Sequence, residues 1–348
     1  MQHLLARVGG LNTYSGAVGP ERVTRLIPKV AWANLVAQIG IIVTGGAVRL
    51  TGSGLGCSTW PNCEPGQFTP QVRDAADYHG LIEFANRGLA GIVLLIALAL
   101  VVLTLVHGRT RPELRRRPVE ALAVGIVAGV VLQAVVGGVT VWVELHPAVV
   151  GSHFLLSGAL VALSAYLVAR LREADGPTRP LAATGVGALR PLAIALAVAT
   201  VVLVVLGVVV TGAGPHSGDE NVGYRFAVDP VSVARIHAVS AWVFTAIVVA
   251  LLVLLHRARP APGAEAEVAR AQRRIRVLLV VTLAQAVVGY AQYFTGLPEL
   301  LVGIHLFAAA VLIATVTFAI TGLRVRTARD AVDDAPAAGA AHPPVAAS

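Results

Sequence analysis

Charged residues make up only 13% of this 348-residue chain, and aromatic residues only 5%. A soluble domain of this length needs more charge to cover a water-facing surface, so the composition excludes that class. The 56% share of hydrophobic residues and the mean hydropathy of +0.75 point the same way. The chain also lacks the H-E-x-x-H and C-x-x-C patterns that mark many zinc sites. We therefore expect an integral membrane protein.

Long apolar runs are what the sequence has in place of charge. Each of eight runs can cross about 30 Å of hydrocarbon as a helix of roughly 20 residues. An even number of spans puts both ends of the chain on one side of the membrane. The predicted fold is all-α, with spans at approximately 30–50, 81–106, 119–142, 148–169, 191–211, 231–255, 276–295 and 299–322.

The basic residues are distributed very unevenly along this pattern. Of the 27 lysines and arginines, 22 fall at the two ends of the chain or in loops on one face. Because short loops rich in Lys and Arg stay in the cytoplasm, we expect a multi-pass protein of the cell membrane with both termini cytoplasmic. The net charge of +8 then reflects topology and contact with lipid, and no nucleic-acid partner is expected. No cleavable signal peptide is evident, since the first apolar run is long enough to span.

A repeat divides the chain into two halves. The segment Gln133–Gly137 recurs letter for letter as Gln285–Gly289, and a histidine follows sixteen positions later in each copy, His153 and His305. This offset of 152 residues predicts two four-helix bundles related by a pseudo-two-fold axis along the membrane normal. The expected order is a cytoplasmic arm (1–29), an N-terminal bundle (30–170), a cytoplasmic linker (171–190), a C-terminal bundle (191–322) and a disordered cytoplasmic tail (323–348).

Three intramembrane histidines lie at matched depth. His153, His237 and His305 each stand about six residues into a predicted helix, counted from the outer face. The position that corresponds to His237 in the second helix is Asn86, at an offset of 151. Two imidazoles that face each other across a bundle suit axial ligation of a haem iron. The alternative is that each histidine only packs helices and bonds nearby backbone. The C-terminal bundle thus offers a complete pair, and the N-terminal bundle an incomplete one.

The second helix carries further polar residues. Glu83 and Arg87 are spaced to form an i,i+4 ion pair at the membrane edge, or Glu83 could accept a proton beside a bound substrate. Arg87 and Arg235, one per bundle, are placed to meet anionic groups such as haem propionates, or to reach the outer headgroups. His79 lies one turn outward of Glu83, where it could approach a ligand, although an exposed loop histidine is the plainer reading.

The only cysteines, Cys57 and Cys63, both fall in the first outer loop. The oxidising compartment and the short gap between them favour a local disulfide. A thiol redox role or a metal site remains an alternative, although two cysteines alone make a poor metal cage.

The sequence resembles the haem A synthase family over residues 30–322. The likeness is carried by the segment Gly45–Cys57 with Trp60, Pro61 and Cys63, by the Glu83–Arg87 string, and by the paired Gln-Ala-Val-Val-Gly segments. It implies an eight-helix duplicated bundle that oxidises the C8 methyl group of haem O to the formyl group of haem A, which haem-copper terminal oxidases require.

The resemblance also implies roles for particular residues. His237 and His305 would hold a resident haem b, with His153 as axial ligand of the substrate haem, Glu83 as the catalytic carboxylate, and Cys57 and Cys63 as the family's outer-loop pair. A haem O synthase is the expected donor, and terminal oxidase assembly factors are the expected acceptors. The oligomeric state stays open, a homo-oligomer included.

One position departs from the family pattern. In the family, the segment that matches Glu83–Arg87 commonly ends in His-Arg. Here it ends in Asn86-Arg87, as in what look like actinobacterial members. Asparagine is a poor iron ligand but a good hydrogen-bonding group. We therefore hypothesise that His153 alone holds the substrate iron, with the sixth position open or filled by water or His79.

Two other classes of function compete with this interpretation. A membrane cytochrome with haem b that reacts with quinone would explain the histidine pair of the C-terminal bundle. It would leave Glu83 and the first outer loop, with its two cysteines, without a role. A transporter with a midplane site is disfavoured, because the unusual residues lie near the outer face and no helix pair is broken at matching midplane positions.

Overall fold

The computed structural model describes residues 20–71, 78–219 and 221–327. Within these ranges, eight helices are long and apolar enough to cross a membrane. They are α1 (Pro20–Leu50), α2 (Tyr78–Thr110), α3 (Arg117–Trp142), α4 (Pro147–Arg170), α5 (Leu189–Ala213), α6 (Pro230–Arg257), α7 (Glu265–Phe294) and α8 (Glu299–Thr321). The predicted all-helical, eight-span membrane fold is confirmed.

Two helices extend well beyond their apolar runs. The first span was expected from residue 30 and the seventh from residue 276, but α1 begins at Pro20 and α7 at Glu265. In these extensions, apolar residues three or four apart are buried on one side while the charged residues remain outside; they are Val23 and Ile27 on α1, and Val268, Ala271 and Ile275 on α7. An amphipathic continuation of this kind escapes a search for continuous apolar runs.

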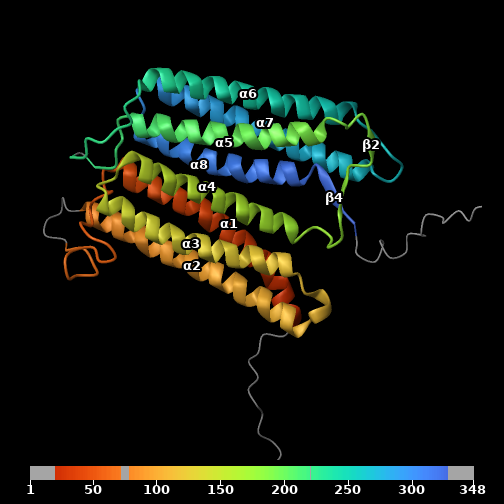
Figure 1. Ribbon diagram of the computed structural model, residues 1–348, viewed down its shortest axis with the longest axis horizontal. Coiled ribbons are helices and arrows are strands. Elements are labelled where there is room, and N and C mark those ends of the chain that lie inside the picture. Colours follow the sequence, from red (N-terminus) through yellow and green to blue (C-terminus); the bar gives the residue numbers. More distant parts are fainter. Residues whose placement is uncertain (1–19, 72–77, 220, 328–348) are drawn as a thin grey trace, which may run out of the picture.

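The helices form two groups that pack side by side (Figure 1). In the first, α1 and α3 each pack against both α2 and α4, so that α2 and α4 lie diagonally across the bundle. In the second, α5 and α7 each pack against both α6 and α8. The groups meet where α1 and α4 contact α8 and where α4 contacts α5. Asn86, His153, His237 and His305 lie on α2, α4, α6 and α8, so each diagonal pair α2–α4 and α6–α8 carries two of these residues.

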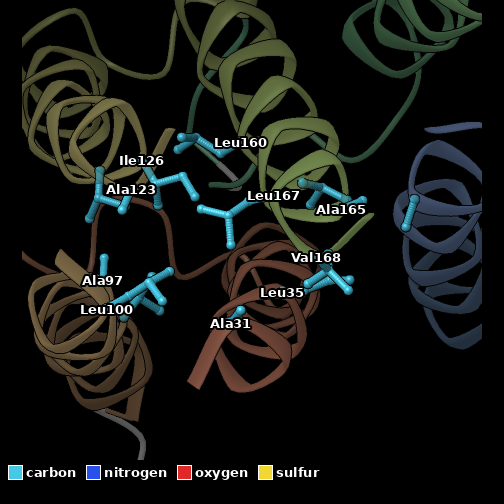
Figure 2. Close-up of a cluster of buried hydrophobic side chains, with 14 of the residues drawn as sticks. Ala31, Leu35, Ala97, Leu100, Ala123, Ile126, Leu160, Ala165, Leu167 and Val168 are labelled. Atoms are coloured by element: carbon cyan, nitrogen blue, oxygen red, sulfur yellow. The ribbon is translucent and has the colours of Figure 1, made fainter. Parts of the chain in front are cut away.

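The core of the first bundle consists of interlocking small and large side chains. Figure 2 shows them filling the space between α1, α2, α3 and α4. Alanines let the helices approach closely, and leucines and isoleucines fill the remaining space. Members of this fully or nearly fully buried cluster include Ala31, Leu35, Ala97, Leu100, Ala123, Ile126, Leu160, Ala165 and Leu167.

The sequence repeat reappears in the backbone of two turns. Leu145, between α3 and α4, has φ 58°, and Leu297, 152 residues later between α7 and α8, has φ 63°. The Leu145 amide donates to the carbonyl of Thr140 at 2.9 Å, and the Leu297 amide to that of Gln292 at 2.8 Å. Left-handed leucines are uncommon, so their recurrence at the repeat offset indicates that the two halves share this local geometry.

Short strands tie the connections together at the opposite end from the residues 51–71 loop. Strand β1 (Thr178–Pro180) pairs antiparallel with β4 (Arg324–Arg326), and β2 (Ala183–Thr184) pairs with β3 (Arg259–Pro260). We expected a disordered tail from residue 323, but its first residues form β4. The linker supplies backbone partners for this strand, and Glu173 pairs with Arg326 at 3.1 Å. Residues 328–348 and 1–19 of the expected tail and arm lie outside the described residues.

Candidate functional site

Each of the three histidines lies against a glycine of the preceding helix. A Cβ atom on Gly137 of α3 would be 3.3 Å from Cε1 of His153 on α4. The same contact measures 3.3 Å between Gly207 and His237, and 3.1 Å between Gly289 and His305. These glycines leave room for an imidazole edge where any larger residue would crowd the ring. We call the space beside each of these glycines a glycine notch, and each of the three rings lies in one.

One ring nitrogen of each of these histidines has no partner in the protein. The Nδ1 atoms of His153, His237 and His305 are all buried without a hydrogen-bond partner. The His237 ring has a backbone contact with Leu203, which does not satisfy its Nδ1 atom. A buried polar atom without a partner is costly, which argues against the reading that these residues only pack helices. The rings are instead suited to a ligand that the polypeptide does not supply.

The repeated glutamine fixes the backbone at two of the histidines. Gln133 Nε2 donates to the carbonyl of His153 at 3.0 Å, and Gln285 Nε2 donates to that of His305, also at 3.0 Å. In the first bundle Gln133 also bonds the hydroxyl of Ser157. Each glutamine thereby joins α3 to α4, or α7 to α8, at the level of the imidazole. The repeat showed where these glutamines stand, but not this role.

His237 and His305 come from the diagonal helices α6 and α8, and His305 lies within electrostatic range of His237. Unpartnered imidazoles on opposite helices, each in a glycine notch, fit the two axial positions of a haem iron. No group of three or more His, Cys, Asp or Glu residues within the described ranges could hold a metal ion without such a cofactor. This donor set fits haem better than zinc.

In the first bundle, Asn86 on α2 lies against a fourth glycine, Gly45 of α1, where the other three glycines each face a histidine. A Cβ on Gly45 of α1 would be 4.0 Å from Asn86 Nδ2. The neighbouring Thr44 donates its hydroxyl to Asn86 Oδ1 at 2.7 Å. The α1–α2 pair thus repeats the α5–α6 arrangement with a hydrogen-bonded amide in place of an imidazole. Sequence reasoning found Asn86 but missed Thr44, because only the fold places α1 against α2 in this register.

Glu83 and Arg87 form the predicted ion pair, at 2.6 Å, and both also hold the first outer loop. Arg87 Nη1 donates to the carbonyls of Thr59 and Asn62, each at 3.1 Å. The backbone N–H of Cys57 donates to Glu83 Oε2 at 2.7 Å. Glu83 is only 6% exposed. The guanidinium of Arg87 is therefore held in place by Glu83 and by the loop carbonyls.

The loop over this bundle is closed by a disulfide. Cys57 and Cys63 are bonded with an S–S distance of 2.03 Å, as predicted. Trp60, between them, lies over α3, where a Cβ on Gly138 would be 2.5 Å from its ring, and stacks edge-on against Trp142 at 5.7 Å. The loop is thus fastened to α2 by Glu83 and Arg87 and to α3 by Trp60.

The two remaining predicted residues lie at the edge of the site. His79 is not an exposed loop residue, because it lies half-buried in the first turn of α2, with Nδ1 2.9 Å from the hydroxyl oxygen of Ser53. Arg235 is exposed on α6, near Asp229. Hydrogen bonds from Ser232 and, more weakly, the charge of Arg235 lower the pKa of Asp229, which caps α6.

Fold and site together define a multi-span membrane protein of two four-helix bundles with candidate haem-ligand histidines on diagonal helices. A family model described as COX15-CtaA, cytochrome oxidase assembly protein, matches residues 29–317. The chain belongs to this family.

Individual relatives match shorter stretches. The chain is 35% identical to Heme A synthase of Bacillus pumilus over 133 residues, 37% of this chain and 40% of the relative. It is 32% identical to Heme A synthase of Lysinibacillus sphaericus over 148 residues, 39% of this chain and 44% of the relative. A stretch of 71 residues, 20% of this chain, is 39% identical to Protoheme IX farnesyltransferase of Thermus thermophilus, covering 11% of that protein. The matches thus span less than half the length of each of these relatives.

Proposed function

We propose that this protein is a haem A synthase, which oxidises the C8 methyl group of haem O to a formyl group. The observation that carries the proposal is the set of three half-buried imidazoles, each in a glycine notch and each with a buried Nδ1 atom that no protein group satisfies. Family membership and the two relatives named Heme A synthase support it. Because it has Asn86 where the family commonly has a histidine, the chain would be an actinobacterial-type member.

The two bundles would divide the work. His237 and His305 would hold a haem b in the C-terminal bundle, and that haem would supply one-electron transfer. His153 would bind the substrate haem in the N-terminal bundle. Arg235, which is exposed about half a turn outward of His237, would meet a propionate of the resident haem at the outer edge. The halves would then be related by a pseudo-two-fold axis along the membrane normal.

Glu83 is the candidate proton acceptor. Oxidation of a methyl group to a formyl group adds oxygen and releases protons and electrons, so a base must stand close to the reacting carbon. Oε1 of Glu83 already accepts two bonds from Arg87, and Oε2 accepts one from Cys57. A carboxylate offers about four lone-pair sites, so Oε2 keeps one free. Arg87 and the loop hold the carboxylate in one orientation while that site takes the proton.

Topology and partners follow from the same proposal. The excess of Lys and Arg in the loops of one face supports cytoplasmic termini, so Glu83 and the disulfide loop would face the outer side. A haem O synthase would donate the substrate, and the similarity to part of a farnesyltransferase that acts on protohaem supports this link. Terminal oxidase assembly factors would accept the product.

Pigment analysis tests the proposal directly. The chain is expressed in membranes of a host that makes haem O but no haem A, and extracted haems are separated by chromatography. We expect haem A with the wild-type chain and none with an empty vector. Bound haem b without any haem A would instead favour the quinone-reactive cytochrome. In parallel, a His153→Ala variant that binds haem O with the wild-type spectrum would disprove the role of His153.

A further inference from the structure

The amide of Asn86 is oriented by its neighbour Thr44. The Thr44 hydroxyl lies 2.7 Å from Asn86 Oδ1, so the carbonyl end of the amide is occupied. The two N–H donors on Nδ2 have no hydrogen-bond partner within the described chain, and Nδ2 lies on the side of Gly45. The protein therefore fixes an amide in the N-terminal bundle with its donor end free.

Thr44 and Asn86 differ together from their counterparts in the second bundle. When Gly45 is aligned with Gly207, Thr44 corresponds to Leu206, and Asn86 corresponds to His237. The second bundle thus has an apolar residue beside an imidazole, whereas the first has a hydroxyl beside an amide. An imidazole that binds iron needs no hydroxyl next to it, whereas an amide needs one to fix which end faces the site. The paired difference indicates a different task at this position.

We infer that Asn86, oriented by Thr44, donates hydrogen bonds to a small ligand on the side of the substrate haem iron opposite His153, and does not itself bind the iron. The inference rests on the proposed function and assigns the chemistry of its sixth position. An amide nitrogen has no free lone pair for a metal, and the amide oxygen is already engaged by Thr44. Donors beside an open axial position select ligands that accept hydrogen bonds.

His79 does not reach this position. It stands seven residues from Asn86 on the same helix, about 10 Å along the axis at 1.5 Å per residue. Its Nδ1 atom is also engaged with Ser53. Within the described residues, Asn86 is therefore the polar side chain on α2 that matches the level of the iron ligand His237 on α6.

Titration of the purified, haem-loaded protein with azide tests the inference. A haem held by His237 and His305 has both axial positions filled, so azide reports on the N-terminal site alone. We expect Asn86→Ala to weaken azide binding about tenfold, because one hydrogen bond is lost, with Thr44→Val in between. Carbon monoxide, a poor hydrogen-bond acceptor, should bind the reduced Asn86→Ala and Thr44→Val variants as it binds the reduced wild type.

Two further variants serve as controls. Asn86→His should supply a sixth ligand and abolish azide binding. Leu206→Thr is the matched control and should change nothing.

Equal azide affinity in Asn86→Ala, Thr44→Val and wild type would overturn the inference, as would a wild-type substrate iron that binds no azide. Haem A formation is followed in the same preparations. If haem A is made but azide affinity does not depend on Asn86, only the inference fails. If azide affinity depends on Asn86 but no haem A forms, the synthase proposal fails instead.

Discussion

At three positions where the first bundle carries a polar residue, the second bundle carries an alanine. At the offset that aligns Asn86 with His237, Glu83 and Arg87 correspond to Ala234 and Ala238. The offset between the two glutamines likewise aligns Ser157, which bonds Gln133, with Ala309. Both bundles nevertheless keep the glycine notch and the glutamine that fixes the histidine backbone. The shared features hold a ring in place, and the features confined to the first bundle supply hydrogen bonds and a carboxylate.

The outer connections differ in the same sense. The loop of the first bundle reaches down to Glu83 and Arg87, so it is part of the site. In the second, arginines fasten the connection between α5 and α6 through carbonyl groups. Arg49 donates to the carbonyls of His216 and Thr211 at 2.8 and 3.0 Å, and Arg225 to that of Gly214 at 2.8 Å. The first connection holds the buried Glu83 carboxylate in place, whereas the second is held only through its own carbonyl groups.

Removal of a histidine should separate the bundles most sharply. We expect His237→Ala or His305→Ala to lose the resident haem b entirely, because each supplies one of two axial bonds. His153→Ala should keep the resident haem and lose affinity for haem O. The measurement is the reduced-minus-oxidised spectrum and haem content of purified protein. Full haem b content in His305→Ala would show that the second bundle is not the resident site.

The next largest effect should come from the carboxylate that the second bundle lacks. Glu83→Gln keeps the shape of the side chain but cannot accept a proton, so haem A formation should fall by about 10²–10⁴-fold. The resident haem spectrum should remain unchanged. The assay is haem A produced per bound haem O.

Glu120→Gln is the matched control for this change. Glu120 is also a buried glutamate of the first bundle, paired with Arg115 at 2.9 Å, but it lies at the opposite end of the helices. The hydrogen bond that the Arg115 guanidinium donates to Glu120 raises the pKa of Arg115. An equal loss of haem A in both variants would mean that Glu83 acts through stability and not through proton transfer.

Much of this comparison was accessible from the sequence. The eight spans, the disulfide and the matched depth of the histidines follow from apolar run length, from two cysteines in an outer loop, and from a repeat offset. Each of these depends on residues close in sequence or on a counted spacing. The starts of α1 and α7 were missed because their first turns are amphipathic, and β4 was missed because its partner β1 lies about 150 residues earlier.

The contacts that specify the site were harder to predict. Thr44, Thr59 and Asn62 look ordinary in the sequence, and their importance comes from where α1 and the outer loop lie beside α2. Gly207 gave no signal of its own, because glycine is common in membrane helices, and Gly45 was noticed only as part of the family segment. Such roles depend on tertiary register, which the repeat indicates only for residues that are identical in both copies.

The glycine notches allow the finest test of the comparison, because the distances to their rings differ. Gly289→Ala would put a Cβ 3.1 Å from His305, which forces the imidazole to move, whereas Gly45→Ala would put one 4.0 Å from Asn86, an ordinary contact. Within a helix this change alone is worth roughly 0.5–1 kcal/mol in favour of alanine, so Gly45→Ala controls for that gain. We expect Gly289→Ala to shift the resident haem spectrum and lower the melting temperature, with Gly207→Ala weaker and Gly45→Ala neutral or slightly stabilising. Equal behaviour of the three variants would mean that the notches do not set the ring positions. The two bundles would then have to hold their ligands through the glutamine bonds and the helix packing alone.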